Sequence, residues 1–235
     1  MACYRPLRAY ASRFGRNAEG KLDISFKALP GYEAISLPCG QCIGCRLERS
    51  RQWAMRCVHE AQMWDRNCFV TLTYNDEHLP ANGSLNKRDI TLFLKRLRKR
   101  YGKGIRYYQC GEYGELLSRP HHHAILFNHD FEDKQLWSVR GGVRLYRSAS
   151  LEQLWPYGYS TIGDVTFESA AYVARYVVKK ITGEREGEHY RGKMPEFATM
   201  SRRPGIGRGW LHFSCIERPP IYNKMSVTNC SGMIL

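Results

Sequence analysis

Hydrophobic residues recur along the chain with two spacings, and the change from one to the other predicts the order of the elements. Apolar or alternating runs of strand length occupy 68–74, 105–112, 120–127 and 159–165. Helical spacing covers 44–65, 86–101 and 167–182, with a shorter helix near 150–155. This order of strand, helix, hairpin, strand and helix favours an α+β fold, with a central, mostly antiparallel sheet and helices packed on it.

Other segments lack a clear period. Residues 1–38 contain several glycines and prolines, which predict an irregular arm. Residues 128–158 are poorly patterned outside their short helix, and 183–209 are polar and rich in glycine. Residues 210–215 are a candidate last strand.

The same pattern divides the chain into three parts. An N-terminal part, 1–66, holds the arm, a cysteine cluster and the first helix. The main domain is expected at 67–216, followed by an irregular tail at 217–235. The length of 235 residues suits one domain with a small appendage.

The helix at 86–101 has a well-defined start and two different faces. Asn86 is the expected N-cap, and Leu85 and Ile90 are spaced as a hydrophobic staple. The outward face carries a cationic run formed by Lys95, Arg96, Arg98, Lys99 and Arg100. Such a run is usually a solvated helix face, and in a nucleic-acid-binding protein it is a candidate contact for a DNA backbone.

Composition favours a nucleic-acid partner. The chain has 36 Lys and Arg against 22 Asp and Glu, a formal net charge of +14. Such an excess suits a polyanion, and fifteen Tyr, nine Phe and five Trp supply faces on which unpaired bases can stack. A membrane surface is the competing polyanion. We expect no membrane association and a cytoplasmic location, because no run has the length of a spanning helix and residues 1–20 lack a signal-peptide core.

Three cysteines with knuckle-like spacing are candidate ligands of a structural zinc ion. Cys39, Cys42 and Cys45 follow one another with glycines between them. A fourth thiolate would complete a tetrahedral site, and Cys3 is the best candidate, with Cys57 and His59 as alternatives on the next helix. The alternative interpretation is that these cysteines are small buried hydrophobic residues.

The strand at 120–127 begins with three histidines. Because side chains on a strand alternate, His121 and His123 point to one face and His122 to the other. Two imidazoles on one face can share a divalent metal ion. The alternative, histidines on the surface or satisfied in a core, fits poorly with three in a row that lead into a buried strand.

The helix at 167–182 carries two tyrosines and a lysine on one stripe. At about 100° per residue, Tyr176 lies roughly 40° from Tyr172, and Lys179 roughly 20° to the other side. A phenol becomes a useful nucleophile only when a cation or metal stabilises its phenolate and the attacked group. Lys179, with Lys180 beside it, can supply that charge. Most helical tyrosines are instead amphipathic residues at the edge of a core.

Together these motifs resemble the HUH superfamily of rolling-circle replication initiators, and within it the microvirus (gokushovirus-type) replication-initiation proteins. Cys68–Tyr74 resembles the first family motif, Pro120–Ala124 the second and Tyr172–Lys179 the third, in the family's order. His122 stands where the family usually has a bulky hydrophobic residue. The resemblance spans about 39–216 and implies a five-stranded palm with the histidines on its central strands.

The resemblance also implies a third metal ligand from the neighbouring strand. Glu112, nine residues before His121, is the first choice, with Glu115 and Gln109 as alternatives. Two histidines and a carboxylate suit Mg²⁺ or Mn²⁺ acting as a Lewis acid. The alternative for both glutamates is a solvated position in a turn.

By the same resemblance, the chain would nick and rejoin single-stranded origin DNA of a small phage. Tyr176 or Tyr172 would attack a phosphodiester and stay bound to the 5′ phosphate, and a host helicase and DNA polymerase would act with it in the bacterial cytoplasm. Two other classes remain open. The chain is otherwise a zinc-stabilised nucleic-acid-binding protein without catalysis, or a metal-dependent nuclease that uses water and forms no covalent adduct.

Overall fold

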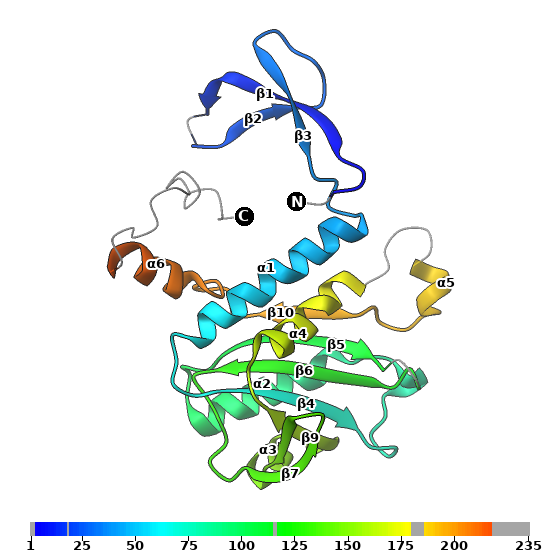
Figure 1. The fold of residues 1–235 in the computed structure, drawn as a ribbon. Helices are drawn as coiled ribbons and strands as arrows, with labels where there is room; N and C mark the ends of the chain where they lie inside the picture. The colour runs from blue at the N-terminus through cyan, green and yellow to red at the C-terminus, as the bar shows by residue number, and fades with distance from the viewer. Residues whose placement is uncertain (1–2, 18, 115–116, 180–185, 218–235) are drawn as a thin grey trace.

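The computed structural model describes residues 3–17, 19–114, 117–179 and 186–217. Its centre is a seven-stranded antiparallel sheet with the strand order β10-β5-β6-β4-β9-β8-β7 (Figure 1). The strands are β4 (Asn67–Tyr74), β5 (Arg106–Tyr113), β6 (Pro120–Phe127), β7 (Gln135–Arg140), β8 (Val143–Arg147), β9 (Gly158–Gly163) and β10 (Phe197–Met200). The α+β class and the antiparallel order are therefore confirmed, and the expected number of five strands is wrong.

Helices cover both faces of this sheet. On one face, α1 (Ile43–Ala61) and α4 (Phe167–Lys179) pack against each other and against β5 and β6. On the other face, α2 (Lys87–Tyr101) and α3 (Ala149–Leu154) pack around the buried Trp155. Alternation along the strands supplies both cores, since Val70 and Leu72 face α2 whereas Tyr108 and Ile125 face α1 and α4.

The helix α2 forms as its sequence predicts. Asn86 accepts a hydrogen bond from the backbone N–H of Arg88 at 3.0 Å, which satisfies a donor in the first turn. Gly102 ends the helix with a φ of 99°, a conformation that favours glycine. The apolar face is fully packed, with Ile90, Phe93, Leu94 and Leu97 all buried.

The N-terminal segment is not an irregular arm. Strands β1 (Leu7–Arg16), β2 (Leu22–Ser25) and β3 (Tyr32–Leu37) form a separate antiparallel sheet with the order β2-β1-β3, beyond the start of α1 (Figure 1). Gly20 and Gly31 lie in the connections with φ values of 74° and 78°. The glycines that suggested irregular structure are thus turn residues between short strands.

Two further expectations are corrected. The poorly patterned insert contains the hairpin β7–β8, whose turn is Gly141-Gly142 with both φ angles positive, as a type I′ turn requires. The expected strand at 210–215 lies inside α6 (Arg208–Glu217) instead. The ring of Trp210 stacks on His59 of α1 with centroids 3.7 Å apart, a contact that the helix makes available.

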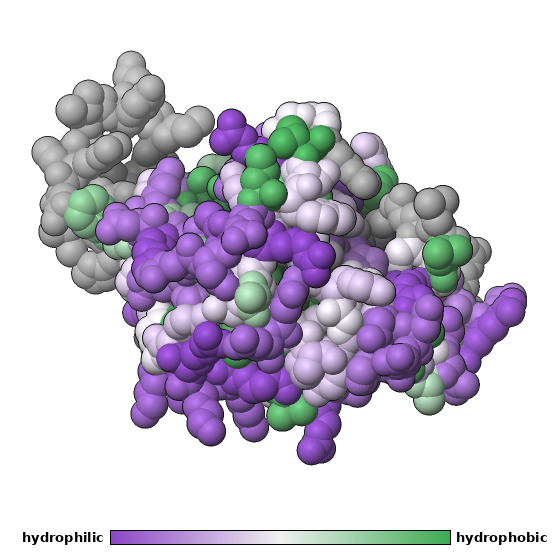
Figure 2. Space-filling model, turned by 90° about the horizontal axis from the view of Figure 1, so that it is seen from below, coloured by the Kyte–Doolittle hydropathy of each residue, from purple (hydrophilic) through white to green (hydrophobic). Residues whose placement is uncertain are grey.

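The surface is largely polar. Seen from the side of β7 and α3, hydrophilic residues dominate, and apolar ones form only small separate patches (Figure 2). Among the described residues, no helix combines the length and the apolar character needed to cross a bilayer. The short helices η1 (Ala81–Gly83) and α5 (Glu186–Tyr190) complete the described fold.

Candidate active site

The histidine strand lies at the middle of the sheet and meets a glutamate on its neighbour. In the register between β5 and β6, His121 faces Glu112 and His123 faces Cys110. All four side chains therefore point to the face that α1 and α4 cover. Since the hairpin joins the two strands directly, the nine-residue separation of Glu112 and His121 becomes a side-by-side pair.

Three polar groups converge on one carboxylate oxygen. Oε1 of Glu112 lies 2.7 Å from Nε2 of His121 and 2.8 Å from Nε2 of His123. The carboxylate is buried, with 2% of the residue exposed, and its Oε2 has no hydrogen-bond partner among the described residues. We call Glu112, His121 and His123 the Glu-His-His cluster; their ligand atoms lie within 4.8 Å of one another.

The other ring nitrogen of His121 is held by the strand backbone. Nδ1 of His121 lies 3.0 Å from the carbonyl oxygen of Arg119, which only accepts, so this nitrogen carries the proton in the neutral ring. Nε2 then directs its lone pair at a carboxylate oxygen. That arrangement is favourable only with a proton or a cation between the two atoms, so the donor set fits a divalent metal ion.

The second histidine is supported by Thr71 on β4. The Thr71 hydroxyl lies 2.9 Å from Nδ1 of His123, opposite it in the β4–β6 register. Phe69 stacks on the same ring with centroids 5.5 Å apart. Sequence reasoning missed Thr71, although the alternation of Phe69, Thr71 and Thr73 along the first motif was a signal of a shared face.

Burial and hydrogen bonding set the charge of the cluster in opposite directions. Burial lowers the pKa of His123 and favours the neutral ring that a metal requires. Burial also acts to raise the pKa of Glu112, but the hydrogen bonds to His121 and His123 outweigh it and leave the pKa below its usual value. The carboxylate is therefore ionised near neutral pH.

His122 points to the opposite face of the sheet. It is fully buried beside Trp155, and its Nε2 lies 3.2 Å from the hydroxyl of Tyr74. Burial lowers the pKa of His122 to about 3, so the ring is neutral. The structure thus separates His122 from the cluster, as strand alternation predicts.

Tyr172 brings α4 to the cluster. Ala170, Val173 and Ala174 bury the opposite side of the helix in the core. The phenol of Tyr172 donates a hydrogen bond to Oε1 of Glu112 at 3.0 Å, and its ring meets His123 edge-on with centroids 5.0 Å apart. With 38% of the residue exposed, this tyrosine is also accessible from outside.

The remaining catalytic candidates lie partly outside the described residues. The backbone of α4 runs through Tyr176 and Lys179, but their side chains and the whole of Lys180 fall outside the described part of the chain. Their roles stay predictions. Tyr176 follows Tyr172 by about one helical turn, which places both on neighbouring turns of one helix.

The alternative third ligands have different outcomes. Gln109 points away from the cluster, since its amide nitrogen donates to the Thr199 hydroxyl at 2.5 Å and its position alternates with Cys110 and Glu112. It therefore does not reach the cluster in this structure. Glu115 falls outside the described residues.

The four candidate zinc ligands are brought together at the base of the small sheet. The sulfur atoms of Cys3, Cys39, Cys42 and Cys45 lie within 4.8 Å of one another, and those of Cys3 and Cys42 are 3.9 Å apart. A tetrahedral zinc site with bonds of about 2.3 Å separates its sulfurs by about 3.8 Å. The sulfur set therefore fits a zinc ion and includes every ligand that the sequence proposed first.

Backbone donors reinforce this group. The N–H groups of Cys39 and Cys42 point at the sulfurs of Cys3 and Cys39, each at 3.3 Å. Hydrogen bonds from the backbone of Cys45 and Tyr4 lower the pKa of Cys42 to about 6. The alternatives are placed elsewhere: Cys57 is fully buried in the core, and His59 stacks on Trp210.

The cationic run of α2 lies on the far side of the sheet from the cluster. Arg96 donates to the carbonyl of Leu154, and Arg98 to that of Ile105. Arg100 donates to Gln153. Three of the five candidates are thus engaged within the molecule, whereas Lys95 and Lys99 are exposed. Contact of this run with DNA stays a prediction.

Comparison with known proteins agrees with the motifs of this site. A family model for replication-associated protein ORF2 matches residues 67–181, which include all three motifs as far as Lys179. Replication-associated protein VP4 of Bdellovibrio phage phiMH2K is 37% identical over 90% of this chain and 67% of that protein. Replication-associated protein ORF2 of Spiroplasma virus 4 is 35% identical over 97% of this chain and 74% of that protein.

A third relative is similar over a shorter share of its length. Replication-associated protein ORF4 of Chlamydia phage 1 is 36% identical over 72% of this chain and 46% of that protein. No solved structure matches the chain. The matches define the class as phage replication-associated proteins. Within that class, the chain belongs to the microvirus family of replication-associated protein ORF2.

Proposed function

We propose that this replication-associated protein is an HUH-type endonuclease that nicks and rejoins single-stranded origin DNA through tyrosine. The observation that carries the proposal is the convergence of Tyr172 and two histidines on the buried carboxylate of Glu112. A metal-binding cluster and an accessible phenol then share one site, as transesterification at phosphorus requires. The family membership and the charge of +14 support DNA as the substrate.

The Glu-His-His cluster would hold a divalent cation, Mg²⁺ or Mn²⁺. Bound there, the ion would act as a Lewis acid toward the oxygens of the scissile phosphate. Imidazole ligands shift the intrinsic preference towards Mn²⁺, whereas carboxylate oxygen suits either ion. The zinc candidate group is distinct, since four thiols suit a closed structural site.

The tyrosine performs the covalent step. Its hydroxyl oxygen bonds to phosphorus as the bond from phosphorus to the 3′ oxygen breaks, so the 5′ phosphate becomes a phosphotyrosine. The phenol proton leaves, and the released 3′ oxygen gains one. The hydrogen bond from Tyr172 to Oε1 of Glu112 orients the phenol. Joining is the reverse reaction, in which a 3′ hydroxyl attacks the phosphotyrosine, so no nucleotide cofactor is needed.

Two tyrosines explain how a circle is released. The first holds the 5′ end, and a second nucleophile cuts the regenerated origin before the released 3′ end closes the circle. Tyr176, about one turn beyond Tyr172 on α4, is the partner. Lys179 and Lys180 would supply charge for the phenolate and the phosphate. The chain has no Gly-x-x-x-x-Gly-Lys-Ser/Thr loop, so unwinding is assigned to a host helicase and synthesis to a host DNA polymerase.

The decisive test is the covalent adduct. The purified chain is incubated with a mixed pool of single-stranded DNA and Mn²⁺, then separated by denaturing electrophoresis. We expect a protein band shifted by attached DNA, which nuclease treatment collapses. Tyr101→Phe, on α2 at the far face, is the matched control and should form adduct normally. Cleavage without any adduct would instead support a hydrolytic nuclease.

A further inference from the structure

A second cationic site lies at the edge of the sheet, outside the Glu-His-His cluster. An open cleft of about 710 Å³ forms where the turn from α2 to β5 meets the segment after β10. No acidic residue lines it. Five of its lining residues are cationic: Arg98, Lys103, Arg106, Arg202 and Arg203. We call it the arginine cleft.

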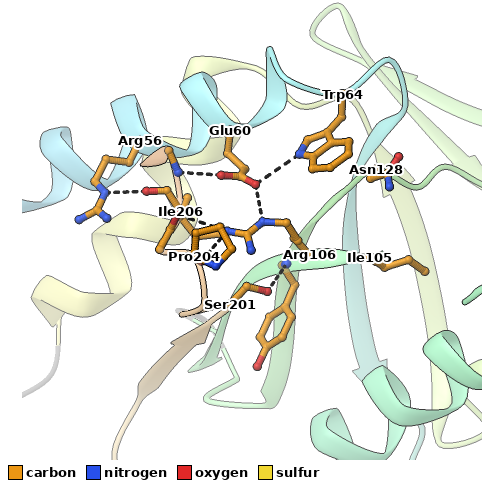
Figure 3. Close-up of polar contacts among 12 residues, drawn as sticks. Arg56, Glu60, Trp64, Ile105, Arg106, Asn128, Ser201, Pro204 and Ile206 are labelled. Carbon is orange, nitrogen blue, oxygen red and sulfur yellow. Dashed lines mark hydrogen bonds and ion pairs between the residues drawn. The ribbon is translucent and has the colours of Figure 1, made fainter. Parts of the chain in front are cut away.

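The wall that carries Arg202 and Arg203 is fixed by a buried ion pair. Glu60 of α1 is 3% exposed and pairs with Arg106 at 2.5 Å. The other carboxylate oxygen of Glu60 accepts from the backbone N–H of Gly207 at 2.7 Å. Figure 3 shows this network linking α1, β5 and the segment that contains the two arginines.

Further contacts hold the same segment. Arg106 donates to the carbonyl of Pro204 at 2.8 Å, and Arg56 to that of Ile206 at 2.9 Å (Figure 3). The backbone N–H of Tyr107 donates to the hydroxyl of Ser201 at 3.1 Å. The backbone that carries Arg202 and Arg203 is therefore set before any ligand arrives, which lowers the entropy cost of binding.

Three charges in this cleft are not neutralised within the described residues. Glu60 compensates Arg106, and Arg98 lies over the ring of Tyr107 with its guanidinium carbon 5.2 Å from the centroid. Lys103, Arg202 and Arg203 are exposed, and no ion pair joins any of them to a carboxylate in the described chain. Cations gathered in a cleft create a positive potential that attracts a polyanion.

The cleft and the cluster stand at opposite ends of one strand. Arg106 begins β5, and Glu112 is six positions further, which corresponds to about 20 Å of strand. The rigid sheet thus keeps the two sites at a fixed separation. We infer that the arginine cleft binds backbone phosphates of the DNA strand whose scissile phosphate lies at the cluster, an inference that rests on the proposed function.

The test measures binding separately from chemistry. Binding of a fluorescent single-stranded 20-mer, a length chosen to exceed the roughly 20 Å between the sites, is followed by anisotropy at several salt concentrations. The variant Lys103→Gln/Arg202→Gln/Arg203→Gln is compared with Lys27→Gln/Arg88→Gln/Arg144→Gln. The control triple loses the same charge at exposed positions that are absent from the cleft lining.

For single strands, each phosphate contact contributes about 0.7 to the slope of log affinity against log salt. We expect the cleft triple to lose about 2 from that slope and to bind roughly 50-fold more weakly at 0.15 M salt. The control triple should keep the wild-type slope within about 0.7. An equal slope in wild type and cleft triple would overturn the inference.

Two further readouts separate the possible sources of phosphate and the two proposals. Inorganic phosphate at matched ionic strength should displace the 20-mer no better than chloride does; selective displacement would assign the cleft to a small anion instead. Adduct formation is measured on the same samples at saturating DNA. A lost salt slope without adduct in any protein leaves the cleft standing and rejects the endonuclease, whereas adduct with an unchanged slope does the reverse.

Discussion

The hydroxyl of Tyr172 lies 3.0 Å from Oε1 of Glu112, the same oxygen that Nε2 of each cluster histidine approaches. Two elements far apart in the chain meet at this oxygen: the hairpin β5–β6 and the helix α4. The helix is placed by its small buried residues, Ala170 and Ala174, which allow it to approach the sheet closely. Small side chains on one side of α4 thus position the phenol on the other.

The tyrosines should be needed for different numbers of cuts. Tyr172→Phe and Tyr176→Phe each remove one hydroxyl, so we expect each single variant to keep some nicking of short oligonucleotides and to fail at circle release. The double variant should form no adduct. Denaturing electrophoresis measures adduct and circles in one assay.

Phenylalanine keeps the ring, so a folding defect is not expected to explain the loss. Tyr101→Phe provides the matched control on the opposite side of the sheet. Normal adduct from the double variant would assign the nucleophile to another residue.

Metal binding should follow strand alternation. We expect His121→Ala and His123→Ala to abolish Mn²⁺ binding, measured by calorimetry, and adduct formation with it, because each removes a ligand nitrogen. His122→Ala should leave Mn²⁺ affinity within about twofold, well under the cost of even an outer-shell change. Because His122 is fully buried, its truncation should destabilise the fold by about 2 kcal/mol or more.

The two effects are separated by measuring affinity well below the melting temperature of each variant. Equal loss of Mn²⁺ affinity in all three folded variants would contradict the alternation of the cluster strand.

Much of this site could be predicted from local sequence, because the strand period alone separates His122 from its neighbours. Glu112 was also accessible to prediction, since a hairpin turns a separation of nine residues into a cross-strand pair. Strand β10 was not, because it is a half-buried edge strand of four residues whose only strand partner in the described sheet is β5. The arginine cleft joins Arg106 to Pro204, 98 residues away, so no local pattern indicates it.

The Thr71 hydroxyl should tune metal affinity without touching the metal. It lies 2.9 Å from Nδ1 of His123 and fixes the ring orientation. We expect Thr71→Val to weaken Mn²⁺ binding by about 10–100-fold, the usual effect of losing an outer-shell partner. Thr161→Val is the matched control, since Thr161 faces Thr71 across the β4–β9 register and has no hydrogen bond to a cluster histidine in the described structure. Unchanged affinity in Thr71→Val would show that packing alone orients His123.

Zinc should be bound by the four clustered thiols. We expect elemental analysis of freshly purified protein to give one zinc per chain, and replacement of Cys3, Cys39, Cys42 or Cys45 by serine to remove it. The loss should lower the melting temperature, because the group connects the small sheet to the start of α1. Cys57→Ala and Cys68→Ala, buried outside the group, should keep the zinc. Protein purified without zinc would reject the site.

Stability should fall below neutral pH partly through His129. Its ring is buried between Tyr101 and Phe131, and Nε2 has no partner among the described residues. Burial lowers its pKa to about 4, so the unfolded chain takes up a proton first as the pH falls below about 6.5. Stability from the neutral ring is thus complete above pH 6.5 and is lost progressively towards pH 4.

Between pH 7 and pH 5, this difference corresponds to about 2 kcal/mol of unfolding free energy. Urea denaturation of wild type and His129→Leu at both pH values measures it, since leucine keeps an apolar side chain of similar size and does not titrate. We expect the variant to lose about 2 kcal/mol less than wild type over this interval. The comparison cancels contributions from other groups, including the zinc candidates and the cluster histidines. Parallel losses in both proteins would mean that the imidazole of His129 reaches water or a partner when it becomes protonated.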